Sequence, residues 1–374
     1  MNAPRVLNPS AARAAGESRS EKPWGWGPTA LKEVRLDETI GMKHGAGGRA
    51  MRALIEQVFA PGLPPMKVEG VGLSAMDDGA ALRIGDRWLV LTTDSHVIQP
   101  IFFPGGDIGR LAVAGTVNDL AMMGATDALA LTFSVIVEEG FPRQDLERIH
   151  ESVRATCEEA GTTIVTGDTK VMGRGELDGI VLNTAGIGVT DRVVRDSGLR
   201  PGDRLLVTGT MGDHGLAVMV HRHGLDLEGE LVSDVAPLND LIRRALEAGR
   251  DAVVALKDPT RGGLASALLE MGSKSGVGIL LEEASVPLSF GVRSAGELLG
   301  IDPLHVANEG KAVLGVAPEA AENVLACLRD HPLGRNAAIV GTCLPDHSGK
   351  VILDTGFGRR LLTEPEGEPL PRIC

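Results

Sequence analysis

The sequence predicts an α/β protein of two domains with mixed sheets. Apolar β-type segments alternate with amphipathic helical segments along most of the chain. A turn-rich stretch at Ser197–Asp203 separates two such runs, and a new apolar strand follows it directly. The chain has 374 residues, 43% of them hydrophobic, which is enough to build two cores of ordinary size. We therefore expect a domain boundary close to residue 198.

The first domain begins, in this prediction, with a strand that ends at Asp94 and a helix with apolar residues at helical spacing. The short strand Thr162–Thr166 is expected to run into a turn at Gly167-Asp168. The predicted strands are Arg87–Thr93, Ala128–Val137, Thr162–Thr166 and Ile180–Thr190, and the predicted helices are Ile108–Met123 and Pro142–Ala160.

The second domain repeats the mixed pattern. Its predicted strands are Arg204–Thr208, Gly278–Leu281, Ala312–Val316, Ala337–Thr342 and Val351–Leu353, and its predicted helices are Leu216–His223, Leu238–Ala248, Leu264–Lys274 and Pro318–Asp330. Asp213-His214, between two glycines, is interpreted as a turn that opens the helix at Leu216.

Composition excludes several classes of function. A net charge of −13 without a basic block argues against nucleic acid or an anionic membrane surface as the partner. No apolar run approaches the length of about 18 residues that a membrane span needs, and residues 1–30 lack the apolar core of a signal peptide. Four widely spaced cysteines without a CxxC pair indicate neither a disulfide framework nor a zinc site. We expect a cytoplasmic protein with reduced thiols.

Aspartates recur at strand ends and in tight turns, in Asp77-Asp78-Gly79, Thr92-Thr93-Asp94, Asn118-Asp119, Gly167-Asp168 and Lys257-Asp258-Pro259. Each alone is typical of a turn or a helix cap. Together they favour Mg²⁺, which takes hard oxygen ligands and keeps substrate phosphates in its shell. The expected metal ligands are Asp77, Asp94, Asp119, Asp168 and Asp258.

Glycines open several predicted helices, as in the segment from His44 to Arg49 and at Gly105-Gly106 and Gly262-Gly263. Free backbone N–H groups at such a position favour a phosphate. The chain contains neither a P-loop nor a G-x-G-x-x-G motif, so ATP would bind without either. The expected nucleotide-binding residues are Lys43, Gly45, Gly47, Gly48, Asp78, Thr93 and Asn118.

The chain ends in a segment with prolines at 365, 369 and 371, followed by Arg372-Ile373-Cys374. Prolines keep such a segment extended, with a reach of about 3 Å per residue, so it predicts an arm that carries the Cys374 thiol between two sites. The alternative is a disordered terminus that happens to end in Cys.

Five strings carry a resemblance to a known family: Thr92-Thr93-Asp94, the segment from Val117 to Gly124, Gly167-Asp168-Thr169-Lys170, the segment from Asp258 to Gly263, and Pro371-Arg372-Ile373-Cys374. From about Ile40 to Cys374 the chain resembles HypE, a family of hydrogenase maturation proteins. The related superfamily includes aminoimidazole ribonucleotide synthetase, selenophosphate synthetase and thiamine-monophosphate kinase. The resemblance implies their two-domain fold, with mixed sheets and a flexible C-terminal tail.

The resemblance also implies an activity. A partner, HypF, would load a carbamoyl group onto Cys374, and ATP with Mg²⁺ would drive dehydration of that group to a thiocyanate. The cyanide would then pass to iron on a HypC-HypD complex. Family members pair through the sheet of the first domain, which implies a homodimer. Lys170 and Glu309 are assigned catalytic roles on the same basis, with Glu309 as the base and Lys170 orienting the amide oxygen or stabilising charge.

Combined with the residue pattern, the resemblance gives four segments: an N-terminal extension (1–38), an ATP-binding and dimerisation domain (39–198), a C-terminal α/β domain (199–357) and a mobile tail (358–374). Two other functions stay open at this point. One is a selenophosphate-synthetase-like or small-molecule kinase on the same fold, although the chain has no Cys before Cys157. The other is a non-enzymatic scaffold whose tail docks a partner.

Overall fold

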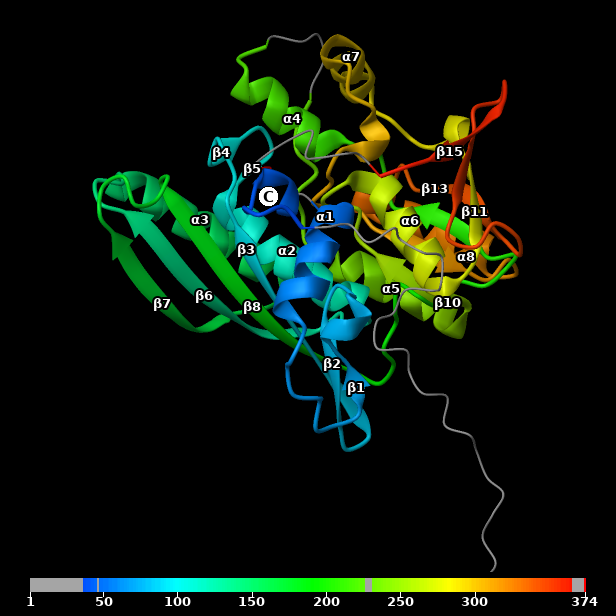
Figure 1. Ribbon diagram of the computed structural model, residues 1–374, viewed down its shortest axis with the longest axis horizontal. Helices are drawn as coiled ribbons and strands as arrows, with labels where there is room; N and C mark the ends of the chain where they lie inside the picture. The colour runs from blue at the N-terminus through cyan, green and yellow to red at the C-terminus, as the bar shows by residue number, and fades with distance from the viewer. Residues whose placement is uncertain (1–35, 46, 226–230, 365–372) are drawn as a thin grey trace, which may run out of the picture.

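The structure, a computed structural model, describes residues 36–45, 47–225, 231–364 and 373–374. It contains two domains, each built around one mixed β-sheet (Figure 1). The α/β organisation with two mixed sheets is therefore confirmed. Most of the predicted N-terminal extension, residues 1–35, lies outside the described residues, and so do residues 365–372 of the predicted tail.

The sheet of the first domain has six strands. In order across the sheet they are β1 (Gly70–Val71), β2 (Ala80–Ile84), β3 (Arg87–His96), β8 (Ile180–Thr190), β6 (Ala128–Glu138) and β7 (Ile164–Met172). Neighbours are antiparallel except β6 and β7, which are parallel and joined by helix α3 (Arg143–Ala160).

Helix α2 (Ile108–Met122) packs on one face of this sheet and is almost entirely buried. It begins at Asp107, whose carboxylate accepts hydrogen bonds from the backbone N–H groups of Gly109 (2.8 Å) and Arg110 (3.0 Å). Thr116 on α2 is hydrogen-bonded to Thr184 on β8 at 2.5 Å, which fixes the helix against the sheet. The last turns of α2 then carry Asn118 and Asp119 to the interface with the second domain.

The other face of this sheet is open. The strand register places Val181, Ile136 and Lys170 side by side in one row. Alternation along the strand puts Ile187 on the same face, opposite to the face that α2 contacts. Lys170 and Ile187 are 64% and 41% exposed. In the single chain this face therefore presents apolar and charged side chains to solvent.

Strand β7 differs from the prediction for this region. The sequence predicts a strand at Thr162–Thr166 and a turn at Gly167-Asp168, but β7 pairs with β6 as far as Met172. Asp168 and Lys170 consequently lie inside a strand. Backbone pairing with β6 overrides the local preference of Gly-Asp for a turn.

The second domain has a seven-stranded sheet. In order across the sheet its strands are β10 (Val253–Lys257), β12 (Val313–Val316), β9 (Arg204–Val207), β13 (Ala338–Leu344), β11 (Gly278–Glu282), β14 (Val351–Asp354) and β15 (Arg359–Leu362). Its helices are α4 (Asp213–Arg222), α5 (Asn239–Gly249), α6 (Gly263–Ser275), α7 (Phe290–Leu299) and α8 (Ala321–Asp330). Leu205 on β9 packs in the core that contains α6, and the next residue, Leu206, in the core that contains α5 and α8. The described part of the chain has no helix that is long and apolar enough to cross a bilayer.

Several element boundaries differ from the predictions. Helix α4 begins at Asp213, so Asp213 and His214 form its first turn instead of a turn before it. Strand β15 pairs with β14 and so includes residues 359–362, which the sequence analysis assigns to the mobile tail. Of its four residues only Leu362 is buried, which explains why periodicity does not reveal the strand. Helix α7 was not predicted.

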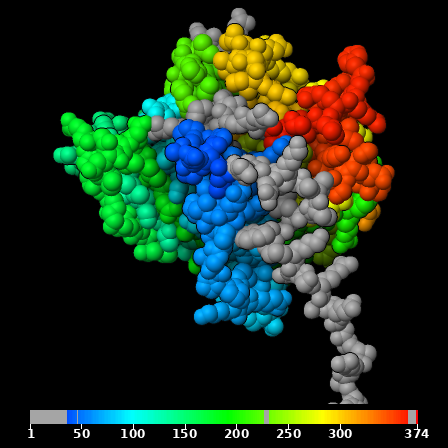
Figure 2. Space-filling model, viewed as in Figure 1, coloured from blue at the N-terminus to red at the C-terminus, as the bar shows by residue number. Residues whose placement is uncertain are grey.

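A short N-terminal segment lies between the two domains. It consists of η1 (Met42–His44) and α1 (Gly48–Leu54), and Figure 2 shows it in blue over the middle of the molecule. Arg52 on α1 lies 3.2 Å from Glu270 on α6 and 2.5 Å from Glu364. These buried ion pairs fix the segment to the second domain.

Candidate active site at the domain interface

A cavity of about 310 Å³ lies between the two domains. Helix α1, the Asp77-Asp78 turn, β3 and α2 line it from one side, and the end of β10, α6 and the loop before β12 line it from the other. The predicted site residues among its walls are Gly47, Asp77, Asp78, Thr93, Asp94, Asp119, Asp258, Glu309 and Cys374. Folding thus brings together residues from nearly the whole length of the chain.

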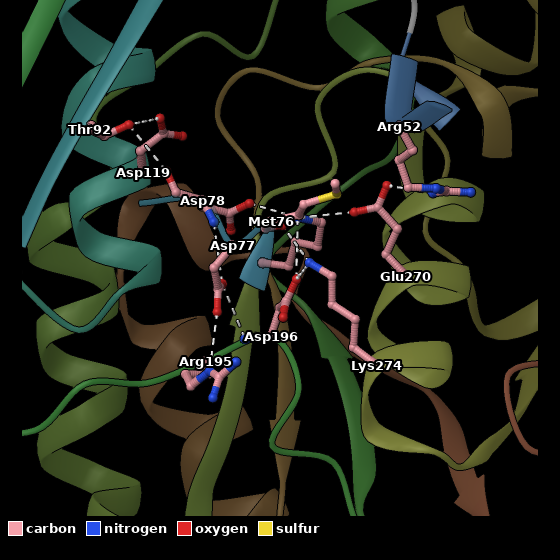
Figure 3. Close-up of polar contacts among 11 residues, drawn as sticks. Arg52, Met76, Asp77, Asp78, Thr92, Asp119, Arg195, Asp196, Glu270 and Lys274 are labelled. Atoms are coloured by element: carbon pink, nitrogen blue, oxygen red, sulfur yellow. Dashed lines mark hydrogen bonds and ion pairs between the residues drawn. The ribbon is translucent and has the colours of Figure 1, made fainter. Parts of the chain in front are cut away.

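Carboxylates from both domains line the cavity, and we call Asp77, Asp78, Asp94, Asp119 and Asp258 together the acidic wall. Figure 3 shows part of it. Asp119 accepts a hydrogen bond from Thr92 Oγ1 at 2.8 Å. Burial, and next the charge of Asp258, raise the pKa of Asp119 well above its ordinary value. Burial, and next the charge of Asp78, raise the pKa of Asp258 to about 8. Because these carboxylates are desolvated and repel one another, the wall favours a cation.

Lys257 supplies a positive charge at the edge of this wall. Its Nζ donates to Asp78 Oδ1 at 2.6 Å and lies 3.4 Å from Glu270 Oε2 and 3.7 Å from Asp196 Oδ2. Burial lowers the pKa of Lys257, but the surrounding carboxylates, Asp78 first, outweigh it and hold the pKa well above its usual range. Lys274 donates to Asp196 at 2.5 Å in the same network (Figure 3). The network links the two domains behind the cavity.

Glu309 faces the cavity from the loop before β12. Its backbone is fixed on both sides, because its N–H donates to Asp234 Oδ1 (2.9 Å) and its carbonyl accepts from Asn118 Nδ2 (3.2 Å). The side chain is 4% exposed, and within the described residues Oε1 has no hydrogen-bond partner. Burial, and next the charge of Asp258, raise the pKa of Glu309 well above its ordinary value. A carboxylate in this environment is a strong base once it is ionised.

The chain ends at the same cavity, because its last residue is one of the lining residues. Ile373 is 4% exposed, and its carbonyl accepts a hydrogen bond from His214 Nε2 at 2.5 Å. Cys374 lines the cavity, and one oxygen of its terminal carboxylate accepts from Val97 N at 3.2 Å. Negative charge at Cys374 is the main cause that raises the pKa of the Arg261 guanidinium. All four cysteines lie in the described residues, and none forms a disulfide.

Comparison with known proteins identifies the family. The AIR synthase related protein N-terminal domain matches residues 76–190, and the corresponding C-terminal domain matches residues 200–354. Carbamoyl dehydratase HypE of Bradyrhizobium diazoefficiens is 48% identical over 341 residues, which cover 90% of this chain and 96% of the relative. The chain belongs to the HypE family. The resemblance found in the sequence is therefore confirmed.

Solved HypE structures share this fold. A HypE-HypF complex contains a chain with a TM-score of 0.77 and 45% identity, over 84% of this chain and all of that one. A HypE structure in complex with ATP has a TM-score of 0.73 and 39% identity, over 90% of this chain and all of that one.

The remaining predicted nucleotide-binding residues of this HypE-family chain lie around the cavity without lining it. Lys43 forms an ion pair with Asp37 at 2.6 Å, and Gly45 accepts a hydrogen bond from Arg261 through its carbonyl. Gly48 borders Glu364. Asn118 is buried, and its side-chain amide forms hydrogen bonds with main-chain groups of the second domain. Its Nδ2 donates to the carbonyls of Ala236 and Glu309, and its Oδ1 accepts from the N–H of Leu238. Its position indicates that it fixes the cavity wall.

Gly47 is the glycine of this segment that reaches the cavity. Its φ of +82° favours glycine, and a Cβ there would lie 3.1 Å from Arg261 Cβ. Gly263, also a lining residue, has φ +62°, and a Cβ there would lie 2.5 Å from the carbonyl oxygen of Val306. A side chain at Gly263 would therefore clash with the backbone, whereas at Gly47 it is mainly the positive φ that favours glycine.

Lys170 and Asp168 are not brought to the cavity of the same chain. Both lie on β7, 3.1 Å apart, with side chains 64% and 61% exposed on the open face of the sheet. The Lys170 ammonium is the main cause that lowers the pKa of Asp168. Their predicted roles therefore require a contribution from outside the single chain.

Sequence reasoning missed the cations of the site. The sequence motifs include Lys257 only as a neighbour of Asp258, and Arg261 only within the segment from Asp258 to Gly263, although both line the cavity. A signal was present, because Val253–Lys257 is an apolar strand that ends in a lysine. A lysine that terminates a buried strand, followed by Asp, indicates a buried ion pair.

Proposed function

We propose that this chain is an ATP-dependent carbamoyl dehydratase that acts on its own tail. It converts an S-carbamoyl group on Cys374 into a thiocyanate, whose cyanide serves iron during [NiFe]-hydrogenase cofactor assembly. The observation that carries the proposal is that Cys374 lines the same cavity as Glu309 and the acidic wall. Three parts of the reaction then lie next to one another. They are the thiol that carries the substrate, a base, and a site for a nucleotide with its cation.

The solved relatives support the co-substrate and one partner. A HypE protein binds ATP in one structure and HypF in another. For this chain we propose ATP as the phosphoryl donor and HypF as the enzyme that carbamoylates Cys374. The acceptor of the cyanide is then iron on a HypC-HypD complex.

The reaction balances as one phosphoryl transfer and one elimination. The carbamoyl oxygen attacks the γ-phosphorus of ATP, ADP leaves, and the nitrogen loses one proton to give a phosphorylated imidate on sulfur. Loss of the second N–H proton and cleavage of the C–O bond release phosphate and leave S–C≡N. In sum, the S-carbamoyl group and ATP yield thiocyanate, ADP, phosphate and one proton. Phosphorylation is needed because an amide oxygen is otherwise a poor leaving group.

Glu309 is our candidate for the base that takes the N–H protons. Its Oε1 is buried and has no hydrogen-bond partner in the described part of the chain, so it is available to a substrate. The raised pKa of Glu309 makes its carboxylate a stronger base than an exposed glutamate. The charge of Arg261 acts in the opposite direction on the pKa of Glu309 and favours its ionised form.

The acidic wall fits Mg²⁺ as the ion that accompanies ATP. Asp78 Oδ2 is buried without a hydrogen-bond partner in the described residues, and the pKa of Asp119 and Asp258 is raised by burial and mutual repulsion. No group of three or more His, Cys, Asp or Glu side chains among those residues is arranged to hold a metal ion. In nucleotide sites one or two carboxylates and the phosphates suffice for Mg²⁺, so Asp78, Asp94, Asp119 and Asp258 are our candidates. When bound, Mg²⁺ neutralises the phosphate oxygens during transfer.

We propose further that the open face of the first sheet pairs with a second copy of the chain. Apolar side chains on that face, among them Ile187, lie in the same sheet as the exposed Lys170 and Asp168. Burying such a face against its twin removes apolar area from water. It would also bring Lys170 of one chain towards the cavity of the other, in line with its predicted role at the carbamoyl group.

Intact-mass spectrometry tests the proposed function. The chain is incubated with HypF and a carbamoyl donor until Cys374 is carbamoylated, and ATP with Mg²⁺ is then added. We expect the adduct to lose the mass of one water while ADP forms in equal amount. A scaffold would keep the adduct unchanged, and a small-molecule kinase would consume ATP equally well without Cys374.

A further inference from the structure

The last two residues of the chain occupy a receptor that the chemistry above does not use. Ile373 is buried in an apolar cluster that includes Ile98 and Phe103 of the first domain and Leu216 of the second. The main chain is held at two points, at Ile373 O by His214 Nε2 and at Cys374 O by Val97 N. We call Val97, Phe103, His214 and Ser233, with this apolar cluster, the tail receptor. It combines a pocket for one side chain with two hydrogen-bond donors for the backbone.

A chain of hydrogen bonds fixes the orientation and tautomer of His214. Val235 N donates to Ser233 Oγ at 3.1 Å, and Ser233 Oγ lies 2.7 Å from His214 Nδ1. Because the Ile373 carbonyl oxygen can only accept, Nε2 of the neutral imidazole carries the hydrogen, and Nδ1 accepts from the Ser233 hydroxyl. His214 then carries its proton on Nε2, which donates to Ile373 O. Phe103 contacts the ring edge-on, with centroids 5.4 Å apart.

The surroundings keep His214 neutral. It is 0% exposed, and burial lowers its pKa, an effect that the charge of Asp234 only partly opposes. A neutral imidazole with a fixed N–H suits an uncharged carbonyl. If the tail leaves, this donor remains buried without Ile373 O, and an unsatisfied buried donor is costly. The receptor therefore favours the return of the tail.

We infer that His214, oriented by Ser233, is a positioning residue that docks the tail through the Ile373 carbonyl and thereby sets Cys374 in the cavity. The inference rests on the proposed function, because it assigns the docked state to dehydration. Carbamoylation by a second protein requires the tail to leave this receptor, since Ile373 is buried in it. Weaker docking should consequently slow dehydration and leave carbamoylation unchanged or faster.

The test compares these two steps in His214→Ala, Ser233→Ala and a control, His221→Ala, which changes an exposed histidine on the same helix. Each full-length variant is carbamoylated by HypF, and the single-turnover rate of water loss is then followed at saturating ATP and Mg²⁺. We expect dehydration to slow about fivefold in His214→Ala, as for the loss of one hydrogen bond, with a smaller effect in Ser233→Ala and none in the control. His214→Gln, which retains a side-chain N–H, should recover part of the rate.

A second measurement does not depend on the proposed function. In a Cys327→Ser background, where the remaining cysteines other than Cys374 are buried, alkylation of Cys374 by N-ethylmaleimide is timed without nucleotide. We expect faster alkylation in His214→Ala. Ile373→Ala removes the tail side chain that the receptor binds and should also make alkylation of Cys374 faster. This variant keeps the test valid even if His214→Ala has a folding defect.

The possible outcomes separate the two claims. If the carbamoylated wild-type chain does not lose water, the proposed function fails, whereas the alkylation rate of Cys374 still reports on docking of the tail. If the carbamoylated wild-type chain does lose water but all variants at His214, Ser233 and Ile373 match it in both measurements, the inference is wrong. Equal slowing of carbamoylation and dehydration in His214→Ala would reduce His214 to a structural residue and would also overturn it.

Discussion

Lys257 Nζ lies 2.6 Å from Asp78 Oδ1, and this buried ion pair joins the second domain to the first. The two side chains are only 11% and 9% exposed. The same ammonium lies within 4 Å of Asp196 and Glu270, which also form ion pairs with Lys274 and Arg52. The pair therefore fixes the relative position of the domains and sets the charge behind the acidic wall.

Removing this cation should destabilise the protein. Lys257→Met keeps most of the side-chain volume but leaves Asp78, Asp196 and Glu270 buried with less compensating charge. Loss of one partner of a buried pair costs about 3 kcal/mol, so the free energy of unfolding in urea should fall by that order. Lys350→Met, at an exposed lysine, is the control and should change little. Equal stability of the two variants would mean that Lys257 is not the central cation of the network.

Without ligands or divalent cations, Asp77 and Asp258 should each make a contribution to stability that falls as pH rises from about 4 to about 8. Burial is the main cause that raises the pKa of Asp77 to about 7 and that of Asp258 to about 8. In the unfolded chain an aspartate ionises near pH 3.9, so within this window these two residues bind more protons in the folded state than in the unfolded state. Their contribution to the free energy of unfolding therefore falls with each rise in pH, until both are ionised above about pH 8.

Urea unfolding midpoints across this pH range test the sign of the effect. Asp258→Asn removes one of the two titrating groups and should flatten the slope. Addition of Mg²⁺ with nucleotide should also flatten it, because a bound cation offsets the charge that appears. A dependence of stability on pH that is the same in Asp258→Asn as in the wild-type chain would contradict the assigned environment of Asp258.

Glu309→Gln should separate the two halves of the reaction. The amide cannot accept a proton, but its size and the two backbone hydrogen bonds of residue 309 are retained. We expect carbamoylation by HypF at the normal rate, and loss of water slowed by about 100-fold or more, as is typical for removal of a general base. Glu282→Gln, at an exposed glutamate, serves as the control. Normal dehydration in Glu309→Gln would exclude Glu309 as the base.

Cys374→Ser should abolish thiocyanate formation while preserving nucleotide affinity. The hydroxyl keeps the shape of the side chain, but it does not provide the sulfur that carries the carbamoyl group. Isothermal titration with ATP and Mg²⁺ should give a similar dissociation constant for the variant and for Cys327→Ser. A large loss of nucleotide affinity in Cys374→Ser would mean that the tail forms part of the nucleotide site itself.

Much of the fold can be predicted from the sequence, because many of its helices and strands are encoded by the residue pattern of their own segment. Helix α3 is expected at Pro142–Ala160 and found at Arg143–Ala160, since its apolar residues follow a clear helical period. Strand β8 is found at the predicted bounds, Ile180–Thr190. Strand β7 was predicted too short, because its extension depends on pairing with β6, which no local pattern encodes.

The site was predicted less completely, for a related reason. Asp78, Asp119 and Asp258 stand out in sequence because each lies in a short polar motif, and all three line the cavity. From the sequence, Asp213-His214 is interpreted only as a turn, because the significance of His214 comes from contact with Ile373, 159 positions away along the chain. A sequence motif indicates residues that lie close together along the chain. The tail receptor is formed by residues that are far apart along the chain and meet only in the folded molecule.

Lys170 offers the last prediction, because its place on the open sheet face requires a second chain. If two copies pair through this face, Lys170 of one chain acts in the cavity of the other. Lys170→Ala and Cys374→Ala chains should each be inactive alone. When they are mixed and allowed to exchange, the Lys170→Ala chain keeps its own Cys374 and Glu309 and receives Lys170 from its partner. Dehydration should then return to about one quarter of the normal level if exchange is random and each cavity dehydrates its own tail.

The controls for this experiment come from the same face. Ile187→Asp places a charge in the proposed contact and should shift the protein from dimer to monomer in light scattering. The same substitution in both mixed chains should abolish the recovered activity. Two outcomes would contradict action of Lys170 across the pair. One is recovered activity that persists when the chains are monomers, and the other is a mixture that forms dimers but stays as inactive as its components. Because Lys170 is 64% exposed and does not line the cavity of its own chain, these outcomes decide whether it belongs to the site.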